Sequence, residues 1–297
     1  MCKDCGCSIT RDHDHHHDHD HHHSHEHDHH EHSHEHSHAH GHEHSHGHHH
    51  EHSHEHSHAH GHEHSHGHHH DHGALRSNPQ LNDKKTLSVI HKILDKNDHE
   101  AAHNRAHFEA HNITAFNLMS SPGSGKTTLL EHLKEYTDLN YGVVEGDLET
   151  SRDADRLIAK GIPAFQIQTG SACHLDAFMV HDALHHVDLA ALDICFVENV
   201  GNLVCPASYD VGTHFNIVLV SVPEGDDKIE KYPVMFRKAD LVLITKADLL
   251  PHFDFSVEEA KAQVKRLNPE AEVITTSIKD GDSMRAVVDW LNTHRSQ

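Results

Sequence analysis

The stretch that decides the fold class is "SSPGSGKTT", Ser120 to Thr128, in a chain of 297 residues. An apolar, β-rich run, Thr114–Met119, precedes it, and a helical pattern begins directly after it. The stretch matches the phosphate-binding pattern G-x-x-x-x-G-K-[ST], with Ser120 in place of the first glycine. In such a loop backbone N–H groups surround a phosphate, the lysine reaches the β and γ oxygens, and the next hydroxyl binds Mg²⁺. The predicted phosphate-binding residues are Gly123, Ser124, Gly125, Lys126, Thr127 and Thr128, with Thr127 as the Mg²⁺ ligand.

Residues 78–297 alternate β-rich apolar runs with helical stretches. A helix is predicted over 81–112, where Leu87, Ile90, Ile93 and Leu94 fall on one face. The predicted strands are Thr114–Met119, Tyr141–Val144, Ala164–Gln168, Ile194–Val197, Ile217–Val220, Leu241–Ile244 and Val273–Thr275. Because helical segments separate most of these strands, the pattern predicts one α/β domain, a mostly parallel sheet with helices on both faces.

A second nucleotide-binding signal is "TKAD", Thr245 to Asp248, which follows the predicted strand Leu241–Ile244. A carboxylate at Asp248 accepts hydrogen bonds from N1–H and the exocyclic amine of guanine, a donor pair that adenine lacks. Lys246 would lay its stem along the base. Alone, these four residues are also compatible with ordinary surface charge, but their place at a strand end after a phosphate loop favours GTP.

Two further segments are typical of a nucleotide switch. Asp147, in "EGDLETSRDADR", follows the second strand and is placed to hold the Mg²⁺ shell, although a helix N-cap is the alternative. In "ENVGN", Glu198 follows the fourth strand and Gly201 lies where its N–H can meet a γ-phosphate. The predicted catalytic residues are therefore Lys126, Asp147 and Glu198.

A candidate metal site combines two distant segments. Cys173 and His174 are adjacent in "GSACHLD", and Cys205 follows Gly201 by four residues. Two thiolates and an imidazole make a tridentate set for Ni²⁺ or Zn²⁺ with a fourth position open. Taken singly, Cys173 and His174 could begin a helix and Cys205 could be core, as Cys195 in mid-strand is expected to be. Because Cys205 follows the segment that would sense the γ-phosphate, loss of that phosphate is expected to weaken the metal site, and the coupling is reciprocal.

The first quarter of the chain has a different composition. Of 48 histidines, 35 lie between His13 and His72, and residues 31–50 recur unchanged as 51–70. Since no aliphatic residue larger than alanine occurs in this stretch, residues 8–77 are predicted to be a disordered tail. Imidazole suits nickel, zinc and copper, so the tail is predicted to bind metal. An expression tag is the alternative, although interleaved Glu, Ser and Gly are not typical of one.

Residues 1–7, "MCKDCGC", form a second cysteine motif. Cys-x-x-Cys is a common two-ligand pattern for a soft or borderline metal, and Cys7 adds a third thiolate. Removal of Met1 would free the Cys2 amine as a further donor. Cys2, Cys5 and Cys7 are therefore predicted to form an N-terminal metal site.

Charge and hydropathy argue against several classes of protein. The formal net charge is −23 with neutral histidine, and protonation of about a quarter of the imidazoles at pH 7 brings it to about −11. Neither the tail nor the remainder is basic, so no nucleic-acid partner is expected. No apolar run of membrane-spanning length or signal-peptide core occurs, so no membrane association and a cytoplasmic location are expected.

Six ordered motifs carry a family resemblance: "CKDCGC", "SSPGSGKTTLL", "VVEGDLETSRDADR", "GSACHLDA", "ENVGNLVCPASYD" and "TKADLLP". They resemble the nickel-incorporation GTPases of [NiFe]-hydrogenase maturation, the HypB family, over essentially all of 80–297 and the first seven residues. The resemblance implies a P-loop NTPase of the SIMIBI class, which includes the signal-recognition-particle and nitrogenase-iron-protein GTPases. It implies GTP, Mg²⁺ and Ni²⁺ as ligands, with Zn²⁺ able to occupy the nickel sites. Carried over by position, Cys2, Cys5 and Cys7 are the N-terminal nickel site, and Cys173, His174 and Cys205 are the domain site.

The resemblance also implies partners: a homodimer through the nucleotide domain, a HypA-type zinc-binding accessory protein, and the hydrogenase large subunit that receives nickel. One departure is Thr245, where many members have Asn, and this is expected to remove one side-chain tether to the phosphate loop. The histidine tract occurs in only some members, so nickel storage is an expected added role. Two alternatives remain open at this point, a nickel storage or detoxification protein and a urease-type nickel-insertion GTPase.

Overall fold

The computed structural model describes residues 84–147 and 151–295. The predictions for the cysteine motif 1–7 and for the histidine tail 8–77 lie outside the described residues. In the described part of the chain, no helix has both the length and the apolar character needed to cross a bilayer.

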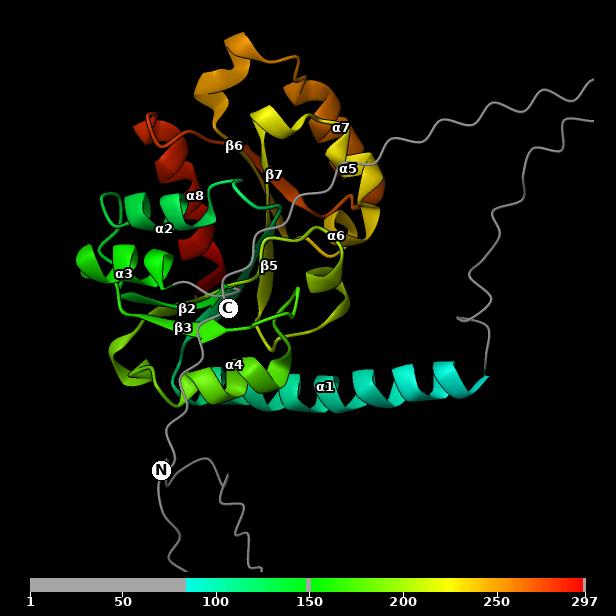
Figure 1. Cartoon of the computed structure of the whole chain (residues 1–297). Coiled ribbons are helices and arrows are strands. Elements are labelled where there is room, and N and C mark those ends of the chain that lie inside the picture. The colour runs from blue at the N-terminus through cyan, green and yellow to red at the C-terminus, as the bar shows by residue number, and fades with distance from the viewer. Residues whose placement is uncertain (1–83, 148–150, 296–297) are drawn as a thin grey trace, which may run out of the picture. The chain divides into compact units, whose positions relative to one another are not determined.

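A parallel sheet of seven strands forms the centre of the described structure (Figure 1). Its strand order is β3-β2-β4-β1-β5-β6-β7. All neighbouring strands run parallel. The strands are β1 Thr114–Ser120, β2 Tyr141–Asp147, β3 Ala164–Gln168, β4 Ile194–Glu198, β5 Phe215–Ser221, β6 Leu241–Thr245 and β7 Glu272–Thr275. Each of the seven predicted strands is present, so the α/β class and its parallel sheet are confirmed.

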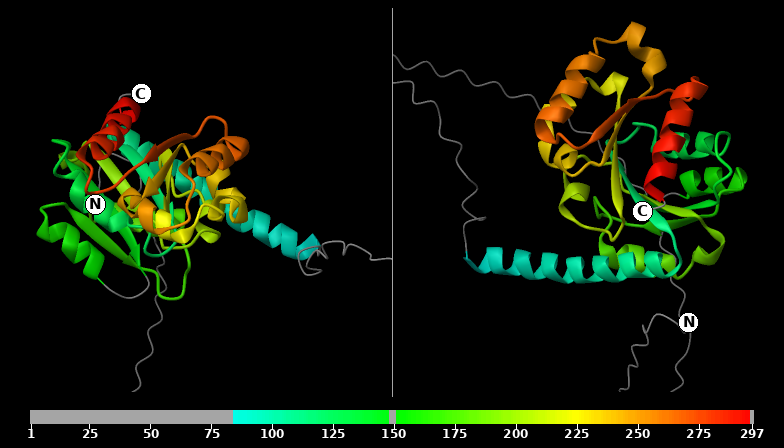
Figure 2. Two further views of the ribbon diagram at one scale, coloured as in Figure 1. Left: turned by 90° about the horizontal axis from the view of Figure 1, so that it is seen from above. Right: turned by 180° about the vertical axis from the view of Figure 1, so that it is seen from behind.

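Helices cover both faces of the sheet, as the two further views show (Figure 2). One face is covered by α2 Lys126–Leu133, α3 Arg152–Ala159 and α8 Gly281–Arg295. The other face is covered by α1 Lys84–Ala110 and α4 Ala177–Leu184, and farther along by α5 Lys228–Lys231, α6 Pro233–Arg237 and α7 Val257–Leu267. Strand residues alternate between these layers: Phe116 and Leu118 of β1 pack on the first face, and Ala115 and Met119 pack on the second.

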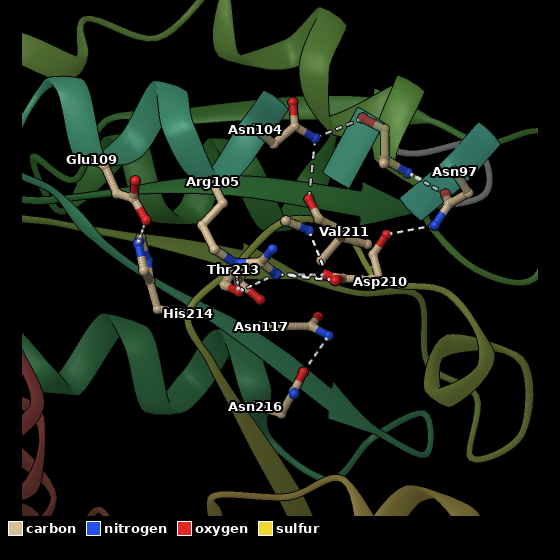
Figure 3. Close-up of polar contacts among 12 residues, drawn as sticks. Asn97, Asn104, Arg105, Glu109, Asn117, Asp210, Val211, Thr213, His214 and Asn216 are labelled. Carbon is tan, nitrogen blue, oxygen red and sulfur yellow. Dashed lines mark hydrogen bonds and ion pairs between the residues drawn. The ribbon is translucent and has the colours of Figure 1, made fainter. Parts of the chain in front are cut away.

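Side-chain amides fasten α1 to the body (Figure 3). The Asn104 Nδ2 donates to the carbonyl oxygens of Ala177 at 2.8 Å and Val211 at 3.1 Å. The Asn97 Nδ2 donates to the carbonyl of Asp210 at 2.8 Å, and its Oδ1 accepts from the backbone N–H of Ala177. Because Asn97 and Asn104 are almost fully buried, these bonds satisfy polar groups that would otherwise be costly to bury. They join α1 to the start of α4 and to the loop before β5.

The predicted helix over 81–112 is confirmed as α1 over Lys84–Ala110, but three of its four apolar marker residues are exposed. Leu87, Ile90 and Ile93 are 41%, 37% and 51% exposed. The buried apolar contacts of α1 come instead from Ala101 and Phe108, which have no exposed surface. Helical periodicity therefore predicted the helix correctly. The packing of α1 against the sheet depends on its C-terminal half, which follows the apolar stripe.

Candidate nucleotide and metal site

The loop between β1 and α2 has the backbone shape that its glycines permit. Gly123 has φ +77° and Gly125 has φ +98°, a region that residues with a Cβ adopt only with strain. The loop forms part of a cavity of about 660 Å³. All residues predicted to bind nucleotide line this cavity, namely Gly123, Ser124, Gly125, Lys126, Thr127, Thr128, Asp147, Gly201, Lys246 and Asp248, and so does Glu198.

Lys126 and Thr127 begin α2 and are both largely buried. The Lys126 Nζ donates to the Ser120 hydroxyl at 3.2 Å, so the serine that replaces the expected glycine accepts a hydrogen bond from the lysine. The Thr127 hydroxyl is 2.8 Å from the Glu198 Oε1 and 3.2 Å from the Asp153 Oδ2. The predicted Mg²⁺ ligand is thus surrounded by carboxylates.

Two buried carboxyl groups lie side by side below the loop. Glu145 of β2 and Glu198 of β4 are register partners in the sheet, and one oxygen of each has no hydrogen-bond partner. Burial, reinforced by nearby carboxylates, raises the pKa of Glu145 to about 8. Burial raises the pKa of Glu198 to about 7, although Lys126 and the Thr127 hydroxyl oppose that shift. Unpaired buried oxygens next to a hydroxyl are a donor set that suits a hard cation, so these residues fit Mg²⁺.

Glu145 was not predicted as a site residue, although a glutamate inside the apolar run "VVEGD" was a visible signal. Asp147 ends β2 and lines the cavity, and Ser151 occupies the N-cap position of α3, so Asp147 does not take its alternative role as that cap. Two other lining residues were also missed. Asp153 and Arg156 of α3 form an ion pair at 2.7 Å at the cavity edge.

At the other end of the cavity, residues after β6 hold the phosphate loop. The Thr245 hydroxyl donates to the carbonyl of Ser124 at 2.7 Å, and the Lys246 Nζ donates to the carbonyl of Gly123 at 2.7 Å. Thr245 was expected to remove a side-chain contact with the phosphate loop, and this expectation is wrong. The threonine hydroxyl reaches the loop carbonyl directly. Both residues act on the loop backbone, where a shift would displace the phosphate-binding N–H groups.

Asp248 lies in the 3-10 helix Ala247–His252 directly after this segment. Its two oxygens accept hydrogen bonds from the Ser277 hydroxyl at 2.8 Å and the Lys279 Nζ at 2.7 Å. These bonds, with that of Lys279 the stronger, hold the pKa of Asp248 below its usual range, so the carboxylate is ionised and available as an acceptor. Ser277 and Lys279 line the same cavity and were not predicted, because they come from the loop after β7.

The three predicted ligands of the domain metal site come together. Ligand atoms of Cys173, His174 and Cys205 all lie within 4.8 Å of one another, the only such trio found among residues 84–147 and 151–295. The Cys173 Sγ is 3.7 Å from the His174 Nδ1. Burial holds the pKa of His174 below its usual value, which favours the neutral imidazole that binds metals. The His174 ring stacks on Tyr209 with centroids 4.0 Å apart, which fixes its plane.

The competing explanations for these residues do not hold. Helix α4 begins only at Ala177, with Asp176 as its N-cap, so Cys173 and His174 lie in the loop before it. Cys205 starts the 3-10 helix Cys205–Ser208 and is partly exposed, whereas Cys195 is fully buried in β4, as expected.

A close contact links the metal-site segment to the phosphate loop. A Cβ placed on Gly201 would lie 2.9 Å from the Cα of Pro122, so only glycine permits this approach. The segment therefore runs from Glu198, on the Thr127 hydroxyl, past the phosphate loop at Gly201, and on to Cys205.

This fold, with a phosphate loop between the central strand and its helix, defines a P-loop nucleotide-binding protein. The family model of the CobW/HypB/UreG nucleotide-binding domain matches residues 114–275. The hydrogenase/urease maturation factor HypB of Helicobacter hepaticus is 49% identical over 227 residues, 75% of this chain and 93% of that protein. The chain belongs to the HypB family.

Solved structures agree in fold. The crystal structure of HypB from Helicobacter pylori in complex with nickel is 48% identical with a TM-score of 0.66, covering 67% of this chain and 95% of that one. The hydrogenase maturation factor HypB of Archaeoglobus fulgidus is 38% identical with a TM-score of 0.64, covering 68% of this chain and 100% of that one. The second match spans a whole solved chain, so a polypeptide without the remaining residues folds in this way.

Proposed function

We propose that this chain is a GTPase that binds nickel and delivers it to the large subunit of a [NiFe]-hydrogenase during maturation. The observation that carries the proposal is the segment from Glu198 to Cys205, which contacts Thr127, Pro122 and Cys173 in turn. One short piece of backbone touches both a phosphate loop and a thiolate site. The Helicobacter pylori relative was crystallised with nickel, and the other two relatives are named as maturation factors, which supports nickel as the cargo.

In the nucleotide half, Lys126 would leave the Ser120 hydroxyl and bind the β and γ oxygens, with the loop N–H groups around the phosphates. Thr127, Asp147 and the carboxyl pair Glu145 and Glu198 would hold Mg²⁺, which supplies charge neutralisation of the phosphates when bound. The Gly201 N–H would meet the γ-phosphate. Catalysis is then mostly positioning, with Lys126, Asp147 and Glu198 as the residues nearest the reacting group.

Guanine selection would rest on Asp248. Its ionised carboxylate would exchange the Ser277 and Lys279 bonds for the N1–H and amine of guanine, while Lys246 covers the base. Adenine offers no matching donor pair, and a desolvated carboxylate without donors costs about 1–3 kcal/mol. GTP is therefore the proposed substrate.

In the metal half, Ni²⁺ is cargo bound by the Cys173 and Cys205 thiolates and the His174 imidazole. Hydrolysis would remove the γ-phosphate that the Gly201 N–H contacts. Because Gly201 packs directly on Pro122, a shift of the phosphate loop would also move the segment from Glu198 to Cys205. Movement of Cys205 would weaken one of three ligands and release the ion. A HypA-type accessory protein and a second copy of this chain are the proposed partners for that release.

The test is the nickel affinity of the chain 78–297, measured with Mg²⁺ and either GDP or a non-hydrolysable GTP analogue. Without the tail and the N-terminal cysteines, the thiolate site dominates the reading. We expect an affinity difference of severalfold between the two nucleotide states, lost in the Cys205→Ser variant. Equal affinities in both states would show that nucleotide does not control the metal, and would refute the proposed coupling.

A second candidate function, nickel storage, is favoured by the 35 histidines between His13 and His72. Deletion of 8–72 should make cells more sensitive to nickel while leaving hydrogenase activity at ample nickel unchanged. The urease-type alternative is tested in the same strains: loss of urease with intact hydrogenase after deletion of the gene would favour it. Storage and delivery are compatible in one chain.

A further inference from the structure

Histidines of α1 and α4 meet in a cluster that is separate from the cysteine site. His181 and His185 are one helical turn apart at the end of α4, and their ring centroids are 4.9 Å apart. The ring of His107, from α1, lies 6.1 Å from that of His185. Cys173 and His174 lie in the loop before α4, whereas His181 and His185 lie in its last turn and at its C-cap, so the length of α4 separates the two clusters.

The hydrogen bonds of His181 determine its tautomer. Its Nδ1 is 3.0 Å from the Asn104 Oδ1 and 3.2 Å from the Glu100 Oε1. The Asn104 Nδ2 already donates to two carbonyl oxygens, so the amide orientation is set and its Oδ1 is an acceptor. A carboxylate is also an acceptor, and His181 must therefore carry its proton on Nδ1. In the neutral ring, Nε2 is then the acceptor atom, and it lies in hydrogen-bond contact with the His185 Nε2.

The two Nε2 atoms of His181 and His185 are 3.3 Å apart. Two imidazole nitrogens, each about 2.0–2.1 Å from one tetrahedral ion, are separated by about 3.3–3.4 Å, so the pair already has ligand spacing. Histidines at i and i+4 on a helix are a recurrent zinc-binding pair. The largely buried ring of His107 lies beside the pair, 6.1 Å from the ring of His185.

We propose that His181 and His185 form a second metal site for a borderline divalent ion such as Zn²⁺ or Ni²⁺. The ring of His107, 6.1 Å from that of His185, is the neighbouring donor that a bound ion would draw in as third ligand. Glu100 and Asn104 are its positioning residues, since a carboxylate or amide oxygen on Nδ1 orients the ring and raises its basicity. The site shares no ligand with the cysteine site and faces α1 instead of the phosphate loop. It does not depend on the proposed function, and its occupancy is independent of nucleotide.

The test uses the chain 78–297, because the histidine tail would mask a single site. This part contains the whole core: all three hydrophobic clusters draw their residues from 108–291, and the Archaeoglobus relative, which matches 68% of this chain, is covered over its whole length. The background carries Cys173→Ser and Cys205→Ser, so the thiolate site is absent. Zn²⁺ and Ni²⁺ binding are then measured by calorimetric titration, with thermal unfolding as the check on folding.

We expect the background to bind one ion at this cluster. His185→Gln, an exposed change that leaves the Asn104 bonds in place, should lower the affinity at least about 100-fold, and Glu100→Gln should lower it about tenfold. The matched control is His99→Gln with His103→Gln, another i, i+4 pair whose rings are 4.6 Å apart on α1. That control should bind as the background does.

Two results would overturn the proposal. One is unchanged binding in His185→Gln, which would mean that the 3.3 Å contact is only a hydrogen bond between two rings. The other is loss of the ion in the His99 and His103 control, which would place it on α1 alone. Anomalous scattering from a Zn²⁺-soaked crystal gives an independent reading, since the ion should appear between α1 and α4.

Discussion

Two proposed cation sites are built on opposite principles: the carboxyl pair Glu145 and Glu198, and the trio Cys173, His174 and Cys205. The carboxyl pair is buried in the sheet, with oxygen ligands of raised pKa that suit a hard ion held with nucleotide. The trio lies in partly exposed loops, with sulfur and nitrogen ligands that suit a softer ion in exchange.

This difference would let one chain bind two kinds of divalent ion, each at its own site. Glu198 and Cys205 are only seven residues apart in one segment, but they differ in donor atom and in burial, so they suit different cations. A buried carboxyl pair is costly to ionise without a cation, whereas an exposed thiolate site releases its ion more easily. Changes confined to one site should therefore affect the binding of one ion and leave the binding of the other unchanged.

The largest expected effect is that of Lys126→Ala. Removing a preorganised phosphate ligand should reduce GTP hydrolysis about 1,000-fold. Nickel affinity of the cysteine trio, measured without nucleotide, should not change. The control is Lys134→Ala, which removes an exposed lysine just after α2 and should hydrolyse GTP normally. Normal turnover in Lys126→Ala would contradict the assignment of the loop.

Cys205→Ser should lower nickel affinity about 100-fold, since it replaces one of three soft ligands by a hydroxyl. GTP hydrolysis in the absence of nickel should stay within about twofold, because no cavity-lining residue changes. Cys195→Ala is the matched thiol control: it removes a buried core cysteine and should leave nickel affinity intact. Equal losses in both variants would indicate a folding defect instead of a ligand.

Asp248→Asn should lower GTP affinity about 10–100-fold, because the amide cannot accept both guanine donors. The same variant should gain affinity for XTP, whose second carbonyl replaces the amine of guanine and can accept a hydrogen bond from the new side-chain amide. The nickel affinity of the cysteine trio should not change. Asp254→Asn, an exposed carboxylate outside the cavity, is the control, and competition binding with GTP and XTP measures the exchange.

The smallest expected effect concerns pH and the carboxyl pair. Because the folded-state pKa of Glu145 is raised from 4.5 to about 8, its protonated form stabilises the metal-free protein at low pH. That stability is fully present below pH 4.5 and is lost as the pH rises through about 8. Glu145→Gln should therefore stabilise the metal-free chain by about 1–2 kcal/mol at pH 8 and by little at pH 5.

Urea unfolding of the chain 78–297 at the two pH values measures this difference, with Glu270→Gln as the exposed control. Magnesium with nucleotide should reverse the order, since Glu145→Gln loses a ligand charge. A stability gain that is equal at pH 5 and pH 8 would mean that the Glu145 carboxyl group is ionised at both pH values. It would contradict a protonated, neutral Glu145 in the metal-free protein.

Most of the fold was predictable from the sequence because its signals are local. All seven strands are apolar runs separated by helical stretches, and the glycines of "SSPGSGKTT" mark a loop whose positive φ angles only they adopt easily. The packing of α1 was not predictable in the same way. Its apolar stripe at Leu87, Ile90 and Ile93 is exposed, whereas Asn97 and Asn104, polar in sequence, are the buried attachments.

The candidate site divides in the same manner. Some site residues could be predicted because they belong to short local motifs: Lys126, Asp248 and the adjacent pair Cys173 and His174. Glu145, Ser277 and Lys279 belong to no motif, and they join the site only because parallel strands end at one edge of the sheet. Thr245 was misjudged because its reach to the Ser124 carbonyl depends on where β6 ends relative to the loop.

By itself, the sequence determined the fold class, the phosphate loop and the kinds of metal ligand, because each depends on residue type and close spacing. The tertiary structure alone decided which distant residues share a site. It pairs Glu145 with Glu198 across two strands, sets Gly201 against Pro122, and brings His107 beside His185. The physical reason is that burial, unpaired oxygens and ligand spacing are properties of neighbours in space, and the sheet order that creates those neighbours is not local in the chain.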